Sequence, residues 1–129
     1  MPLVKISILK GWDKVEKKKA SDIIHNSLVK AFKIPESDYS HRIIEFEKEN
    51  FIFPESKSEK IIIIEMDVFP GRSKNAKKEL YKMIVDSLEL MGIPRNDVTI
   101  VLSEPLLENW GIKGGKAADE ENIGFNIKV

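Results

Sequence analysis

The chain has 129 residues, 42% of them hydrophobic, and its 21 lysines and arginines balance 21 aspartates and glutamates. This length and composition predict one domain, residues 1–129, with a real hydrophobic core. Zero formal net charge argues against nucleic acid and anionic membranes as partners, and no apolar run could span a bilayer. The absence of cysteine excludes disulfides and thiolate chemistry, and two histidines are too few for a histidine-based metal site. We expect a cytoplasmic protein without metal or cofactor.

The first predicted elements are a strand and a helix. Residues 3–9 alternate between apolar and polar side chains, which is typical of a half-buried strand, and Gly11 ends it. Apolar residues with helical spacing follow, and Asp13 and Glu16 are placed to form a capping box at the start of this helix. Pro35 ends the helix because it cannot continue the hydrogen-bond ladder.

A second strand and helix pattern follows. Residues 41–47 predict a strand, and the run KIIIIEMDVF at 60–69 is the most strongly β-biased segment of the chain. Ser73 is a suitable N-cap for a second helix with one apolar face. The segment at 92–103 ends that helix and begins a fourth strand, and IGFNIKV at 123–129 predicts a short fifth one.

The sequence repeats itself. ILKGWDKVEKK at 8–18 matches VFPGRSKNAKK at 68–78 with an offset of 60, and KIPESDY matches GIPRNDV with an offset of 59. We therefore predict an α+β fold of two βαβ units, about residues 2–47 and 61–103, followed by a loop and strand at 104–129. Both helices cover one face of a four-stranded mixed sheet. The other face is left bare, which favours assembly.

The two ends of such a sheet differ in chemistry. If a pseudo-twofold axis relates the units, one end collects four features of the sequence: Pro2, Asp38, Arg72 and the loop after Ser103. The equivalent positions at the other end are Ile62, Asp97 and Trp12. Polar groups kept at one end only suggest a site there.

These polar groups have complementary abilities. Removal of Met1 would expose the secondary amine of Pro2, which could act as a general base or attack a carbonyl. Arg72, directly before the start of a helix, could hold a carboxylate or an enolate oxygen, and Asp38 could orient water or substrate. Alternative roles stay open: Pro2 as the first residue of a strand, Arg72 as a surface cation, and Asp38, like Asp97, as a turn residue.

Two aromatic residues lie in segments close to these groups. Trp110, in the Gly-containing loop at 108–122, could form a pocket wall or an interface anchor. Tyr39 follows Asp38 directly, and we assign it to substrate binding, with packing as its alternative role.

Taken together, these motifs resemble the tautomerase superfamily. Pro2 at the start of a strand, the duplicated βαβ unit, IPESDY, PGRS before the second helix and ENWGIKGG are similar to its branch containing malonate semialdehyde decarboxylase. The superfamily also includes 4-oxalocrotonate tautomerase and macrophage migration inhibitory factor. The resemblance covers nearly the whole chain, and its specificity comes from the order and spacing of short motifs.

The resemblance implies a homotrimer with active sites between subunits, removal of Met1, and Pro2 as the catalytic amine. It also implies that Asp38 and Arg72 fill the polar and carboxylate-binding roles and that Trp110 lines the pocket. The sequence departs from the decarboxylase at Pro70, where that enzyme has a second arginine. This departure disfavours decarboxylation of malonate semialdehyde.

We expect a small enzyme that moves a proton between carbon and oxygen in a carbonyl acid. A decarboxylase or hydratase of a three-carbon acid such as malonate semialdehyde, using the same amine, is the first alternative. A non-catalytic trimeric scaffold of the same fold is the second.

Overall fold

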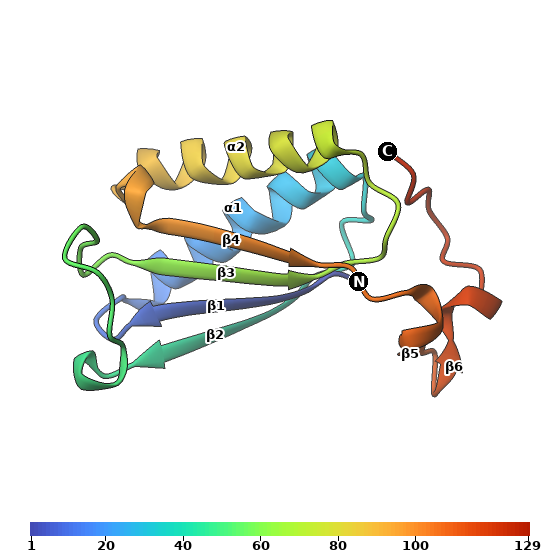
Figure 1. The fold of residues 1–129 in the computed structure, drawn as a ribbon, viewed down its shortest axis with the longest axis horizontal. Coiled ribbons are helices and arrows are strands. Elements are labelled where there is room, and N and C mark those ends of the chain that lie inside the picture. Colours follow the sequence, from blue (N-terminus) through green and yellow to red (C-terminus); the bar gives the residue numbers. More distant parts are fainter.

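The computed structural model describes residues 1–129 and shows one sheet with two long helices across a single face (Figure 1). The sheet has the order β2-β1-β3-β4, with β1 antiparallel to β3 and the outer pairs parallel. The strands and helices are β1 (Leu3–Leu9), α1 (Lys14–Phe32), β2 (Ser40–Phe46), β3 (Ile62–Asp67), α2 (Lys74–Leu90) and β4 (Val98–Ser103). The predicted fold class of two βαβ units is confirmed.

Both helix starts follow from local sequence. The Asp13 carboxylate accepts from the backbone N–H of Glu16, while the Glu16 carboxylate accepts from the N–H of Asp13, so the predicted capping box is confirmed. Ser73 caps α2 by accepting from the N–H of Ala76 at 3.1 Å. Neither helix is long and apolar enough to cross a membrane.

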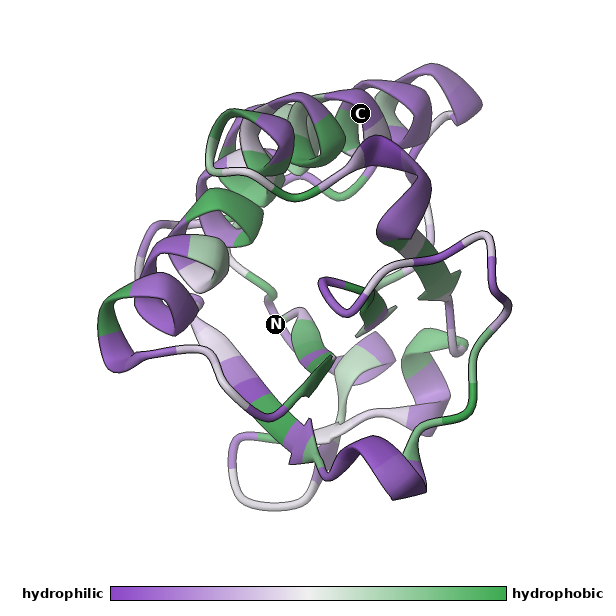
Figure 2. Ribbon diagram, turned by 90° about the vertical axis from the view of Figure 1, so that its left-hand side faces the viewer, coloured by the Kyte–Doolittle hydropathy of each residue, from purple (hydrophilic) through white to green (hydrophobic).

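The hydrophobic core lies between the helices and the sheet. Val4, Ile6 and Ile8 of β1 pack with Ile62, Ile64 and Met66 of β3 beneath the apolar faces of α1 and α2. Hydrophobic and hydrophilic residues alternate along the turns of each helix, as expected for a helix with one buried face (Figure 2). Only the core side of the sheet is covered by helices.

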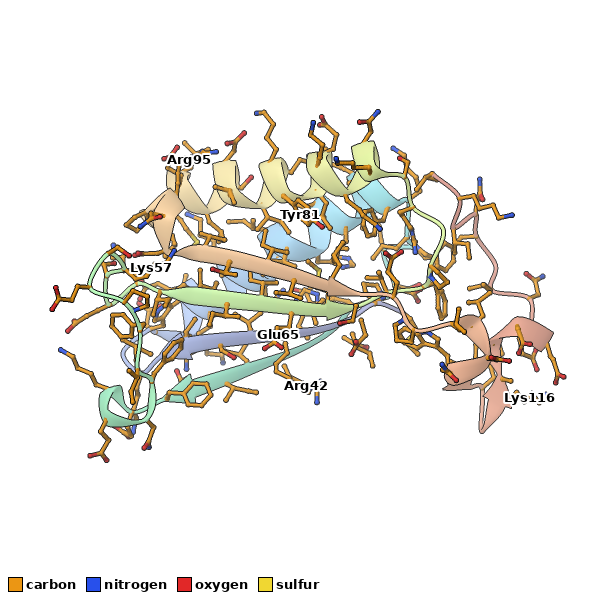
Figure 3. All side chains as sticks on the ribbon, in the orientation of Figure 1. Arg42, Lys57, Glu65, Tyr81, Arg95 and Lys116 are labelled. Carbon is orange, nitrogen blue, oxygen red and sulfur yellow. The ribbon has the colours of Figure 1, made fainter.

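The uncovered face of the sheet carries a mixture of charged and apolar side chains. Arg42 and Glu65 extend from it on the side away from the helices (Figure 3), and the strand register places Lys5 between them. Ile44 and Val101, which share this face, are 36% and 48% exposed. The uncovered face is therefore less apolar than the face that packs against the helices, although it includes solvent-exposed branched residues.

The C-terminal part differs from the prediction. No strand forms over 123–129, and the additional strands are a small hairpin of β5 (Gly111–Ile112) and β6 (Lys116–Ala117). The final segment is held by other contacts, since the Val129 carbonyl accepts from the N–H of Ser73 at 2.8 Å. Phe125 and Ile127 pack on a second hydrophobic cluster formed by Phe69, Trp110 and Ala118. Packing of these side chains thus holds the final segment in place of the hydrogen-bond ladder of a strand.

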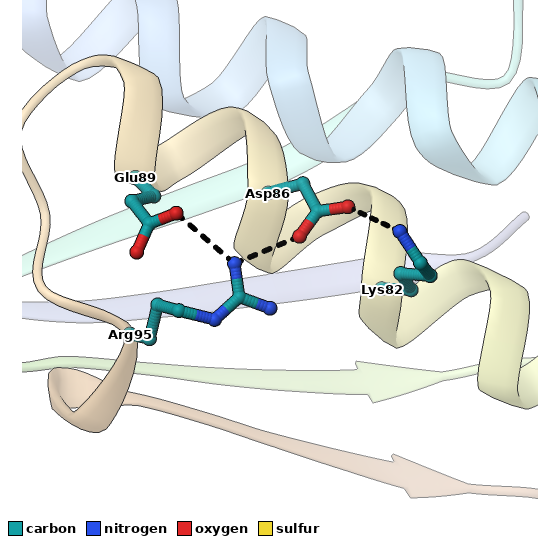
Figure 4. A network of polar contacts seen from close by, with 4 residues as sticks. All are labelled: Lys82, Asp86, Glu89 and Arg95. Atoms are coloured by element: carbon teal, nitrogen blue, oxygen red, sulfur yellow. Dashed lines mark hydrogen bonds and ion pairs between the residues drawn. The ribbon is translucent and has the colours of Figure 1, made fainter.

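Surface charges join the end of α2 to the turn before β4. Arg95 contacts Asp86 at 2.8 Å and Glu89 at 3.2 Å, and Lys82 contacts Asp86 at 2.7 Å (Figure 4). These side chains are 41–69% exposed, so each pair contributes at most about 1 kcal/mol.

A polar aromatic cluster fastens the edge strand β2 to α1. The Ser21 hydroxyl lies 2.8 Å from both the Tyr39 hydroxyl and Nδ1 of His41, and the Tyr39 ring stacks on His25 at 4.1 Å. Burial, reinforced by repulsion from His25, lowers the pKa of His41 to about 4. His41 is therefore neutral in the folded protein near pH 7.

We expect this cluster to make the fold sensitive to acid. Because the pKa of His41 falls from 6.5 to about 4 on folding, the unfolded chain binds a proton more readily between these values. The contribution of neutral His41 to the free energy of unfolding is complete above about pH 6.5. It falls by ~2 kcal/mol toward pH 4, after allowance for partial exposure of the ring. Urea unfolding from pH 7.5 to 4 measures this loss.

His41→Asn is the matched variant, because it removes the titrating ring while keeping a polar side chain beside Ser21. Its free energy of unfolding should be lower at pH 7.5 but should decline less steeply with acid. Equal slopes for the variant and the unmodified protein would show that other groups, such as nearby Asp22, control the acid response.

Candidate functional site

The strand register brings the predicted residues to one end of the sheet. Leu3 at the start of β1 pairs with Ser40 at the start of β2 and with Asp67 at the end of β3. Asp67 in turn pairs with Ser103, the last residue of β4. This end, the Pro2 end below, holds the N-terminus (Figure 1).

Asp38 faces the start of the chain. The amino group of Met1 donates a hydrogen bond to the Asp38 carboxylate at 2.8 Å, and Pro2 is buried directly behind Met1. Asp97, the repeat equivalent, is 2% exposed and accepts from the backbone N–H and the hydroxyl of Ser58. The two aspartates thus have different partners, because Asp97 anchors the loop between β2 and β3 while Asp38 contacts the terminal amine.

A cavity of about 170 Å³ lies at this point. Its walls combine the Asp38 carboxylate, the Lys113 ammonium and apolar side chains: Met1, Phe69, Ile112, Ile123 and Phe125. The volume is below the 300–1,000 Å³ that is typical of pockets for drug-sized ligands, so the cavity suits a small molecule. The cavity therefore brings an acidic residue, a lysine and an apolar wall together.

Arg72 lies beside this cavity and is occupied by backbone carbonyls. Its Nη1 donates to the Phe69 carbonyl at 2.9 Å and its Nη2 to the Phe32 carbonyl at 3.3 Å, while Nε is buried without a partner. The guanidinium lies 4.8 Å from the Phe32 ring and 5.8 Å from the Phe125 ring. Burial lowers the pKa of Arg72. Because Phe125 also lines the cavity, a single ring adjoins both the guanidinium and that space.

Trp110 stands behind the cavity wall. It is 7% exposed, donates from its indole N–H to the Pro105 carbonyl at 3.2 Å, and packs edge-on against Phe69 at 4.8 Å. Phe69, which lines the cavity, is therefore held in place by Trp110.

Tyr39 points in another direction. Its hydroxyl contacts Ser21 and donates to Asp22 at 2.7 Å, so it faces α1, and it is absent from the cavity lining. The structure brings Asp38, the chain start and the wall supported by Trp110 together at the cavity. Arg72 is separated from the cavity by the Phe125 ring, and Tyr39 does not line it.

Sequence reasoning missed Lys113, Phe69 and Phe125. Lys113 has a left-handed backbone conformation with φ of 48°, and its ammonium donates to the Asn122 carbonyl at 2.8 Å. A cation within the Gly-containing loop after Trp110 was an available signal for Lys113. Nothing in the local pattern marks Phe125, because its position depends on the fold of the final segment.

Known proteins share this architecture. A malonate semialdehyde decarboxylase structure superimposes with a TM-score of 0.81 at 24% identity, over 89% of this chain and 93% of that one. A fused 4-OT symmetric trimer superimposes with a TM-score of 0.81 at 18% identity, over 91% and 96% of the two chains. The probable tautomerase YusQ of Bacillus subtilis (strain 168) is 29% identical over 91% of this chain and 97% of its own length.

Sequence profiles agree with the structural comparison. One profile described as "Tautomerase enzyme" matches residues 38–113, and a second with the same description matches residues 2–60. The first alone spans more than half of the chain, from the loop that carries Asp38 to Lys113. The protein belongs to the tautomerase family.

Proposed function

We propose that Pro2, released by removal of Met1, is the general base and acid of a keto–enol tautomerase that acts on a small carboxylate-bearing carbonyl compound. The observation that supports this most directly is the position of the chain start: the Met1 amine lies 2.8 Å from the Asp38 carboxylate beside a small cavity, and buried Pro2 is the next residue. While Met1 is present, the Pro2 nitrogen is an amide and takes no proton. Processing moves the free amine back by one residue, into the buried position.

The reaction conserves protons and electrons. The neutral Pro2 amine takes a proton from the carbon next to the carbonyl, and the C–H electron pair forms the C=C bond of an enolate. The proline cation then returns the proton to another carbon, or an oxygen atom receives it. Burial disfavours the proline cation and the Asp38 carboxylate favours it, so the two influences oppose each other.

Two cations are available for the substrate carboxylate. Lys113 lines the cavity directly, and Arg72 would reach it by exchanging its backbone carbonyl partners for the substrate and displacing the Phe125 ring. A carboxylate binds a guanidinium more strongly than neutral carbonyls do, which favours the exchange. We assign Trp110 to support of the Phe69 wall. For Tyr39 we infer an indirect contribution, since its contacts with α1 fix the segment that carries Asp38.

We infer a homotrimer with active sites at the subunit interfaces. Similar folds include fused 4-OT trimers. The uncovered sheet face, with exposed Ile44 and Val101, offers surface for such an assembly. The interface would enclose a cavity that is small in the isolated chain.

Decarboxylation or hydration of a three-carbon acid is the second candidate. The decarboxylase fold supports it, since one similar structure is described in connection with both decarboxylase and hydratase activities. Pro70 opposes it, because the second arginine of the resembled enzyme is missing. A non-catalytic scaffold would need neither the amine nor the cations.

The amine is tested by changing Pro2 while leaving the fold intact. Pro2→Gly should lower kcat for 2-hydroxymuconate or phenylpyruvate about 10²- to 10⁴-fold, because a primary amine of different basicity and position replaces the proton carrier. Intact mass must first show that Met1 is removed. Release of carbon dioxide from malonate semialdehyde, measured in parallel, separates the two candidate reactions.

A matched control is Pro2→Ala measured for both mass and turnover, which distinguishes altered processing from altered chemistry. Undiminished turnover by protein that retains Met1 would contradict the role of the amine. A processed protein that turns over none of these compounds and fails to react with a halopropiolate would favour the scaffold.

Substitution of Lys113 and of Arg72 should have different effects on KM and on stability. Lys113→Gln should raise KM for a carboxylate substrate about 10-fold with little change in stability, because its ammonium bonds an exposed carbonyl and forms only a long, partly exposed ion pair with Glu121 at 4.0 Å. Arg72→Gln should both raise KM and lower the free energy of unfolding by ~2 kcal/mol, because the Phe32 and Phe69 carbonyls lose their donor. Steady-state kinetics and urea unfolding measure the two effects.

Lys116→Gln, on the same hairpin, is the control for loss of a surface cation. If Arg72→Gln lowers stability and leaves KM unchanged, the arginine is purely structural and Lys113 alone binds the carboxylate. Unchanged KM in both variants would contradict carboxylate recognition at this cavity.

A further inference from the structure

A second cavity, of about 290 Å³, lies at the end of the sheet opposite Pro2. It is bounded by the turn after β1, the turn after α2 and the loop between β2 and β3. Gly11, Trp12, Met91 and Ile93 form part of its lining. None of the groups assigned to the proposed reaction lies there.

The internal repeat explains why this space is open. Gly11 corresponds to Gly71, Trp12 to Arg72 and Met91 to Phe32. A Cβ atom at Gly71 would lie 3.0 Å from the carbonyl oxygen of Ile127, so the final segment of the chain covers that end. A Cβ atom at Gly11 would meet nothing within 4 Å. The same architecture is therefore covered by the chain at one end and uncovered at the other.

The interior of the cavity suits a flat apolar group. Leu9 and Ile93, 5% and 4% exposed, provide aliphatic surface. The Trp12 indole and the Met91 thioether also line the space, and both side chains contact aromatic rings favourably. At the Pro2 end the equivalent positions, Arg72 and Phe32, contact each other instead. Where Arg72 contacts the Phe32 ring at the Pro2 end, Trp12 at the opposite end provides apolar lining for the cavity.

The rim carries one cation that no carboxylate neutralises. Lys10 contacts Glu47 at 2.9 Å, and Lys48 contacts Glu59 at 2.5 Å. Lys60 donates to the Gly92 carbonyl at 3.1 Å and forms no ion pair.

The remaining rim acid is engaged elsewhere, since Glu16 bonds the backbone N–H of Asp13 in the capping box. The Lys60 ammonium, beside Met91, is left with further donors for an anion.

We propose that this cavity binds a small aromatic carboxylate, with the ring against Trp12 and Met91 and the carboxylate on Lys60. The volume is close to the lower limit of pockets that take small organic ligands, which excludes large cofactors. The site is independent of the proposed reaction, because it lies at the other end of the sheet and shares no residue with the Pro2 cavity.

An NMR titration with phenylacetate tests the proposal on the full chain. The two tryptophans give separate indole N–H signals, one from each end of the molecule. The Trp12 indole and the amides of Gly11 and Gly92 should shift and saturate at millimolar phenylacetate. Lys60→Gln should weaken this affinity at least fivefold, while Lys82→Gln, the change of an exposed lysine on α2, should leave it unchanged.

Acetate is the control ligand, because it offers the carboxylate without the ring and should not saturate the same signals. Absence of saturable shifts at Trp12 would overturn the proposal, and this includes the case in which a neighbouring copy fills the cavity. Equal affinity in Lys60→Gln, or shifts confined to Trp110 and Lys113, would overturn it as well. Turnover need not be measured, so failure here leaves the proposed reaction untouched.

Discussion

The antiparallel pairing of β1 with β3 determines the layout of this molecule. It relates the two βαβ units in opposite directions, from Leu3 opposite Asp67 to Ile8 opposite Ile62. Because parallel pairs flank this centre, each end of the sheet receives the start of one unit and the finish of the other. Pro2 and the turn before Arg72 therefore lie at the same end of the sheet, although they are far apart in the sequence. Reversal of this single pairing would separate the amine from Phe69 and Arg72, which follow β3, although the parallel pairing of β1 with β2 would keep Asp38 beside it.

The final segment makes the two ends unequal. Phe125 and Ile127 pack on the Phe69 and Trp110 cluster, and the Ile127 carbonyl lies close to Gly71. At that end the φ of 126° at Gly71 and the lack of a Cβ allow the close approach. Gly11 has a similar φ of 127° but no covering segment, so its conformation serves only the turn from β1 into α1. A nearly symmetric scaffold thus acquires one end that the final segment covers and one end that it leaves uncovered.

The parts that the sequence predicted are those governed by local rules. Strand alternation located β1, the spacing of Asp13 and Glu16 located the start of α1, and the repeat predicted two βαβ units in one four-stranded mixed sheet. What it did not predict depends on contacts far apart in the chain. Tyr39 turns toward α1 because Ser21 and Asp22 offer it partners, and no periodicity marks those partners beforehand. The alternation at 123–129 predicted a strand that does not form, and residues 104–122 lack a regular pattern, so neither the hairpin nor the position of Phe125 followed from residue order.

The structural contacts of Arg72 would prepare it for the carboxylate-binding role that we propose. The carbonyls of Phe32 and Phe69 fix the guanidinium, so the side chain has already lost its rotamer freedom before any ligand arrives. Neutral carbonyls satisfy its donors only in part, since Nε has no partner, and burial disfavours the cation. An incoming carboxylate would supply the missing acceptor and the opposite charge in the same place. The Phe125 ring is the barrier to this exchange, and it belongs to a segment held by apolar packing rather than by a strand ladder. In the proposed mechanism, a displacement of that segment would open the cavity and release the arginine together.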